Sequence, residues 1–269
     1  HALTGRFGRR NMEYISLGYD ILPVLHGRSP IQAYADFMRN FRDTFRSFLG
    51  GIITLRYPSC PSQKLGWAWR SRELGEFQCY DKCMLASLIV CALEIEMREW
   101  ENGGPVGAGN LMHNPENTEF LFEVMTPCGE FFLEWYSRML LQHGERICTE
   151  AETNFRGTEV STSSKVAGIY WHYNTPSHSS ELTAGYYNTS SRDGYLPIAQ
   201  MFGRYGFTMC CSVVQKAFLI RQLLLAARIC NIPLEGENSS TGLDDESFLQ
   251  VPKTSKLYSA ANAGVVLVY

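Results

Sequence analysis

The sequence lacks any apolar run of the ~18 residues that a membrane-spanning helix requires. It also lacks an excess of either charge, because 24 lysines and arginines stand against 27 aspartates and glutamates, for a formal net charge of −3. That balance provides no basic footprint for nucleic acid or for an anionic membrane surface. We therefore expect neither nucleic acid nor a membrane as a partner, and favour a neutral or small polar ligand.

Zinc motifs are missing as well, although the chain has nine cysteines. No CxxC occurs, and Cys79 and Cys83 have neither a second cysteine pair nor a nearby histidine to complete a tetrahedral site. The cysteines are irregularly spaced, and only Cys210 and Cys211 are adjacent. Since cysteine is often buried as a small hydrophobe, this pattern favours buried free thiols in a reducing compartment. We expect no metal site.

Apolar residues recur at helical spacing in four segments. The clearest follows Ser29-Pro30, an N-cap residue with proline at the first helical position, and ends at Gly50-Gly51. The other three predicted helices are 84–93, 131–140 and 215–229, and the predicted strands are 15–17, 52–55, 166–171, 207–213 and 265–269. Alternating strands and helices predict an α/β fold with parallel strands, with the chemistry on loops that follow the strands.

Four strings are unusual enough to indicate a family. They are LRYPS (55–59), GEFQCYDK (75–82), ELTAGYYN (181–188) and GEN (236–238), and RRNMEYISLG (9–18) and RDGYLPIA (192–199) occur in matching order. With these strings the sequence resembles beta-amylase in its plant plastid form, a glycoside hydrolase that releases maltose from the non-reducing ends of α-1,4-glucans. The resemblance implies a (β/α)8 barrel, a starch or maltodextrin ligand, no cofactor and a plastid location, although no targeting segment is recognisable.

The resemblance begins well inside that barrel. The family's opening strands have no counterpart, and the run at 265–269 stops before its last barrel helix. We therefore expect residues 1–269 to form one partial domain, an incomplete (β/α)8 barrel of the TIM type. An open barrel leaves strand edges unpaired and apolar faces uncovered, so a chain without a stable fold stays open as an alternative.

The resemblance implies that the catalytic acid is missing. Inversion at a glycosidic bond needs a carboxylic acid that protonates the leaving oxygen and a carboxylate that activates water. The family places its acid immediately before the leucine of LRYPS, where this sequence has Thr54, and the glycine-rich turn ahead of that glutamate is missing too. A threonine hydroxyl cannot protonate a departing sugar near neutral pH. Glu76 could replace it, although an acidic residue after a loop glycine more often caps a turn or helix.

The catalytic base is present by the same resemblance. Glu237 of GEN matches the family's general base, and Asn238 and Ser239 match its sugar contacts. Taken alone, a glutamate in a glycine- and asparagine-rich loop is more often a solvated turn residue. The resemblance therefore assigns Glu237 its position, while activity depends on an acid that the chain does not supply.

Further binding residues follow from the resemblance. Lys165 matches a lysine that contacts sugar hydroxyls, and Tyr170 stands where the family has a subsite histidine. A tyrosine can still stack on a sugar or form a hydrogen bond with it, so binding is weakened and not excluded. His172 and His178 lie nearby, but each is more often a packing or loop residue than a replacement ligand.

The family's mobile inner loop is the third loss. Ser212 falls near the family's substrate-contacting threonine, and the spacing from Arg204 favours it over Thr208. The acidic loop that should follow is replaced by a predicted helix, so closure over a substrate is not expected. Three hypotheses remain: a glucan-binding or regulatory protein without useful hydrolysis, which we favour; an active beta-amylase with another acid; and a truncated product without a stable fold.

Overall fold

The computed structural model describes residues 1–46, 51–56, 77–101, 103–104, 126–169, 179–187, 193–211, 217–236, 249 and 253. The chain divides into two compact units, each drawn from three separate stretches. Unit 1 contains His1–Phe37, Cys60–Ile147 and Trp171–Arg192, and unit 2 contains Met38–Ser59, Cys148–Tyr170 and Asp193–Tyr269. The single partial domain expected for residues 1–269 stays a prediction.

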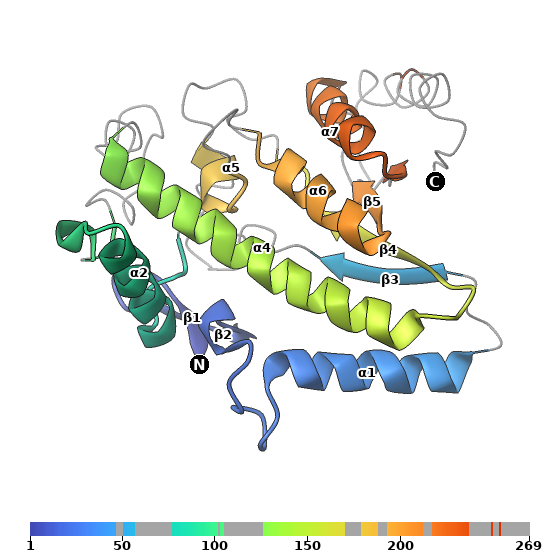
Figure 1. Cartoon of the computed structure of the whole chain (residues 1–269), viewed down its shortest axis with the longest axis horizontal. Helices are drawn as coiled ribbons and strands as arrows, with labels where there is room; N and C mark the ends of the chain where they lie inside the picture. The colour runs from blue at the N-terminus through green and yellow to red at the C-terminus, as the bar shows by residue number, and fades with distance from the viewer. Residues whose placement is uncertain are drawn as a thin grey trace. The chain divides into compact units, whose positions relative to one another are not determined.

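Unit 1 contains an antiparallel ribbon and several helices (Figure 1). The ribbon pairs β1 (Ala2–Thr4) with β2 (Arg10–Ile15) and leads into the 3-10 helix η1 (Leu17–Tyr19). The helices are α2 (Lys82–Glu94), the short η4 (Arg98–Trp100), α5 (Ser179–Thr183) and the first parts of α1 (Pro30–Phe45) and α4 (Pro127–Phe155). The strand predicted at 15–17 is therefore wrong in extent, because Ser16 caps η1 through its hydroxyl and ends the extended run.

The core of unit 1 is aromatic. Phe77 makes edge-to-face contacts with Phe132 and Tyr136, with ring centroids 5.2 and 5.3 Å apart. Trp135 is almost fully buried, and its indole nitrogen donates a hydrogen bond of 3.3 Å to the Ser87 hydroxyl of α2. These contacts fix α2 against α4. Phe77 is the first residue of the GEFQCYDK string that the structure describes. It thus contributes to packing in the core of unit 1.

Unit 2 contains a four-stranded parallel sheet in the order β3-β4-β5-β6. Its strands are β3 (Gly51–Arg56), β4 (Ser161–Val166), β5 (Thr208–Cys211) and β6 (Leu234–Gly236). In the chain, α6 (Tyr195–Tyr205) precedes β5, and α7 (Ala217–Cys230) lies between β5 and β6 (Figure 1). The expected α/β organisation with parallel strands is confirmed.

Local sequence explains where the helices of unit 2 begin and end. The Asp193 carboxylate accepts hydrogen bonds from the Tyr195 and Leu196 amides at the start of α6, and from the Gln222 side chain of α7 at 2.9 Å. Gly206 ends α6 in the left-handed conformation that glycine adopts without strain. The RDGYLPIA string therefore caps α6 and ties it to α7.

Helix α1 (Pro30–Phe45) starts as predicted. The Ser29 hydroxyl accepts from the Gln32 amide, and the Gln32 side chain accepts from the Ser29 amide, so the two residues form a capping box. The predicted helices at 84–93 and 215–229 correspond closely to α2 and α7, whereas α4 is 29 residues long and far exceeds the segment predicted at 131–140. In the described part of the chain, no helix is long and apolar enough to span a bilayer.

One further strand prediction needs correction. The strand expected at 166–171 is β4, which runs from Ser161 to Val166 and ends where the prediction began. Its sequence STSSKV has few apolar residues, so hydropathy placed the strand too late. The strand expected at 52–55 is confirmed as β3, the one at 207–213 is confirmed in its first part as β5, and 265–269 lies outside the described residues.

All eight cysteines that the structure describes are free, as predicted, and four of them are buried: Cys79, Cys148, Cys210 and Cys211. Burial raises the pKa of the Cys79 thiol well above its usual value, which lowers its thiolate fraction further. We expect a thiol reagent at pH 8 to modify at least four fewer cysteines in the native protein than in urea. Rapid modification of every cysteine without denaturant would favour the hypothesis of a chain without a stable fold.

Candidate site at the carboxyl edge of the parallel sheet

The carboxyl ends of the four strands lie along one edge of the sheet, because all strands are parallel. The register pairs Arg56 of β3 with Lys165 of β4, Lys165 with Cys210 of β5, and Cys210 with Glu235 of β6. The strands end at or one residue beyond this row. In open or closed parallel sheets, ligand sites form at this edge, on the loops that follow the strands.

The two faces of the sheet differ in polarity. Val166, Met209 and Leu234 lie on one face and are fully buried. Lys165, Thr208 and Glu235 alternate with them on the other face and are each partly accessible. A face that carries an ammonium and a carboxylate while keeping access to solvent can bind a polar ligand, whereas the apolar face forms the core of unit 2.

Thr54 lies within β3, where the register sets it beside Ser163 of β4. It is two residues before the end of the strand, and therefore one layer below the row that contains Lys165. The backbone thus brings two of the predicted site residues, Thr54 and Lys165, to neighbouring strands at the carboxyl half of the sheet. The sequence carries no carboxyl group at either position.

The chain that leaves β4 is fixed by a helix of the same unit. The Ile169 amide, three residues beyond the strand, donates a hydrogen bond of 3.1 Å to the Tyr195 hydroxyl. Tyr195 is fully buried at the start of α6, and Ile169 is buried as well. A buried side-chain acceptor on α6 thus fixes the backbone at Ile169, the residue that precedes Tyr170 in the sequence.

The other predicted site residues lie outside the described residues: Glu76, Tyr170, His172, His178, Ser212, Glu237, Asn238 and Ser239. Two of them directly follow strand ends, since β5 ends at Cys211 and β6 ends at Gly236. Thr208 is the first residue of β5, at the opposite end of the strand.

Sequence analysis missed Glu235, which lies in the middle of β6 on the same face as Lys165. Burial raises the pKa of its carboxyl group. The residue was overlooked because β6 has only three residues and was not predicted as a strand. The alternation in Leu234-Glu235-Gly236, with buried neighbours around a partly accessible glutamate, is the pattern that marks it.

The family follows from comparison with known proteins. The sequence of residues 2–264 matches the family model of glycosyl hydrolase family 14. This chain belongs to that family. It is 45% identical to "Beta-amylase 1, chloroplastic" of Arabidopsis thaliana over 95% of this chain and 49% of the relative, and 44% identical to "Beta-amylase 2, chloroplastic" of Oryza sativa subsp. japonica over 94% and 50%. The chain thus spans about half the length of these curated relatives.

A solved structure shows the fold of this family 14 chain. The crystal structure of the catalytic domain of beta-amylase from Paenibacillus polymyxa matches 99% of this chain and 67% of that chain, with a TM-score of 0.74 and 19% identity. At that identity the likeness concerns the fold alone. The expected α/β architecture of a beta-amylase catalytic domain is therefore confirmed, and the relatives named above agree with the plastid-type resemblance.

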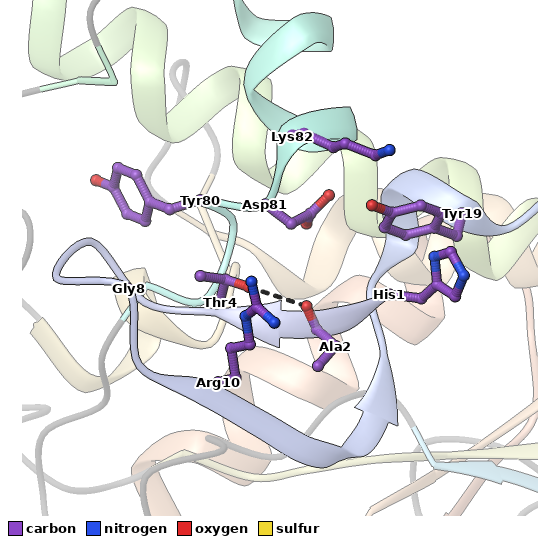
Figure 2. Close-up of a pocket in the computed structure, with 9 residues that line it drawn as sticks. All are labelled: His1, Ala2, Thr4, Gly8, Arg10, Tyr19, Tyr80, Asp81 and Lys82. Atoms are coloured by element: carbon purple, nitrogen blue, oxygen red, sulfur yellow. Dashed lines mark hydrogen bonds between the residues drawn. The ribbon is translucent and has the colours of Figure 1, made fainter.

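A separate pocket of about 410 Å³ lies in unit 1 (Figure 2). It is bordered by the β1–β2 ribbon and by Tyr80, Asp81 and Lys82 at the start of α2, and the rings of His1 and Tyr19 meet edge to face at 4.5 Å. Burial, followed by the influence of Cys83 and Asp81, raises the pKa of Tyr19 to about 12.

The acidic group of that pocket has a structural role. The Asp81 carboxylate accepts hydrogen bonds from the Cys83 and Met84 amides, at 2.9 and 3.2 Å, and from the Ser16 hydroxyl. These bonds cap α2 and tie it to the residue that caps η1. Among the described residues, no group of three histidine, cysteine or acidic side chains could hold a metal ion.

Proposed function

We propose that this family 14 chain binds α-1,4-glucan at the carboxyl edge of its parallel sheet and hydrolyses it weakly or not at all. The observation that supports weak hydrolysis is Thr54, which lies in β3 where the resemblance places the family's general acid. General acid–base catalysis contributes typically 10²–10⁴-fold in rate, so losing one of the two groups leaves a trace of activity.

Support for binding comes from the groups that the chain retains. Lys165 lies on the accessible face of β4, in the position of a lysine that contacts sugar hydroxyls by resemblance. In the proposal Glu237 is the retained base, and the remaining sugar contacts are Tyr170, Ser212, Asn238 and Ser239. Hydrogen bonds from an ammonium to sugar oxygens are charge-assisted and need no catalytic acid.

We also propose how this chain relates to the family's barrel and where in the cell it acts. Residues 1–269 correspond to part of the family's (β/α)8 barrel, with the opening strands and the last helix not represented. Three relatives carry "chloroplastic" in their names, which supports a plastid location for this chain and a role in starch metabolism as a glucan-binding or regulatory protein.

Glucan binding is tested by isothermal titration of the purified protein with maltoheptaose. Lys165→Ala removes a charged donor, and we expect it to weaken binding on the order of 10-fold or more. Lys82→Ala is the matched control, because Lys82 is exposed and belongs to unit 1. Absence of binding by the unmodified chain, or equal loss in both variants, would reject the proposed site.

A further inference from the structure

Glu235 is a partly buried carboxyl group without a structural partner among the described residues. No hydrogen bond or ion pair joins its carboxylate to any of them, and desolvation is the cause that raises its pKa. Withdrawing a carboxylate from water without compensating hydrogen bonds is unfavourable, so such groups concentrate at functional sites. None of the described residues thus uses the Glu235 carboxylate in packing the fold.

The register sets Glu235 in a row with Cys210 and Lys165 on three adjacent strands. Neighbouring strands are ~4.8 Å apart, so the Cα atoms of Lys165 and Glu235 are separated by about 10 Å. The residue between them, Cys210, has a short side chain and is 9% exposed. Two long polar side chains thus lie in one row on either side of a short one, on the face of the sheet that carries Lys165.

We propose that Glu235 is a sugar-binding residue of the candidate site, where its carboxylate accepts hydrogen bonds from glucan hydroxyl groups on the side of Cys210 opposite Lys165. The inference rests on the proposed function. An ionised carboxylate is an acceptor only and a lysine ammonium is a donor only. A sugar hydroxyl both donates and accepts, so the two residues together satisfy a ring that carries several hydroxyls.

The position of Glu235 supports binding and not proton donation. It is two residues before the proposed base Glu237 in the chain, which limits the distance between the two Cα atoms to about 7 Å. An inverting acid must protonate the leaving oxygen while the base activates water on the opposite face of the sugar. Two residues whose Cα atoms are so close together do not surround a sugar in that way.

The test compares maltoheptaose binding by the full chain and by Glu235→Gln, which keeps the shape and removes the charge. We expect the variant to bind on the order of 10-fold more weakly or worse, because charge-assisted hydrogen bonds to the sugar are lost. Glu134→Gln on the exposed face of α4 is the matched control, with unchanged affinity. The thermal midpoint of Glu235→Gln should equal or exceed that of the parent chain.

The outcomes distinguish a failure of the role proposed for Glu235 from a failure of the proposed function. Equal affinity of the parent chain and Glu235→Gln overturns the role of Glu235 and leaves the proposed function intact. A midpoint that falls together with the affinity assigns Glu235 a structural role and also overturns it. Absence of maltoheptaose binding by the parent chain removes both proposals.

Discussion

The purified protein is expected to release maltose from soluble starch at no more than about one-hundredth of the rate of a family 14 enzyme that has both carboxyl groups. The physical reason is the loss of proton donation to the departing sugar. Thr54 lies in β3 at the proposed acid position, and a hydroxyl group cannot supply a proton near neutral pH. Maltose is measured by chromatography, with identical enzyme and starch concentrations for the two proteins.

The decisive control is Glu237→Gln, which removes the proposed base from the same chain. If the acid is missing, the remaining trace should change little when the base is removed as well, because the two groups act as a unit and their contributions are not additive. Robust maltose release that disappears in Glu237→Gln would show that another carboxyl group supplies the proton. That result would reject weak hydrolysis and restore the hypothesis of an active beta-amylase.

Elements with a complete cap or a nearly continuous apolar pattern could be predicted from the sequence. Helix α1 has a complete capping box of Ser29 and Gln32, and α7 has an almost unbroken apolar pattern. Strand β3 is short but apolar, so its position was also predicted well. In each of these elements the local sequence pattern carries the signal.

The rest of the fold could not be predicted because tertiary contacts decide it. One face of β4 carries Ser163 and Lys165, and the other carries the buried Ser164 beside Val166, so hydropathy signals no strand there. Strand β6 has three residues and is defined only by pairing with β5. Glu235 was not predicted for that reason, whereas Lys165 is predicted by the resemblance and not by a strand pattern.

A buried ionic cluster in unit 1 provides the largest expected effect on stability. The Asp20 side chain is 4% exposed and contacts the His143 Nδ1 atom and an Arg146 guanidinium nitrogen of α4, each at 2.9 Å. We expect the double variant His143→Ala/Arg146→Ala to lower the free energy of unfolding by about 3–5 kcal/mol, since it leaves a buried carboxylate without a cation. Urea denaturation followed by tryptophan fluorescence measures the change.

An exposed ion pair in the same unit is the matched control. Arg28 and Asp36 are 3.0 Å apart, with side chains 55% and 35% exposed, so Arg28→Ala should change the free energy of unfolding by no more than about 1 kcal/mol. The contrast between the two pairs tests burial, because their separations are nearly equal. Equal losses for both would show that the Asp20 cluster is solvated in the native protein.

Variants that remove different charges of the Asp20 cluster distinguish two effects. One is the loss of attraction between opposite charges, and the other is the cost of leaving a buried charge unpaired. His143 and Arg146 are about one-third exposed, at 31% and 32%, so water can still solvate them when Asp20 is neutralised. Asp20→Asn alone should therefore cost less than the double variant. Adding Asp20→Asn to the double variant should recover part of its lost stability, because the unpaired carboxylate is then removed. If the triple variant is less stable than the double variant, the Asp20 side chain stabilises the fold by packing and hydrogen bonding and not through its charge.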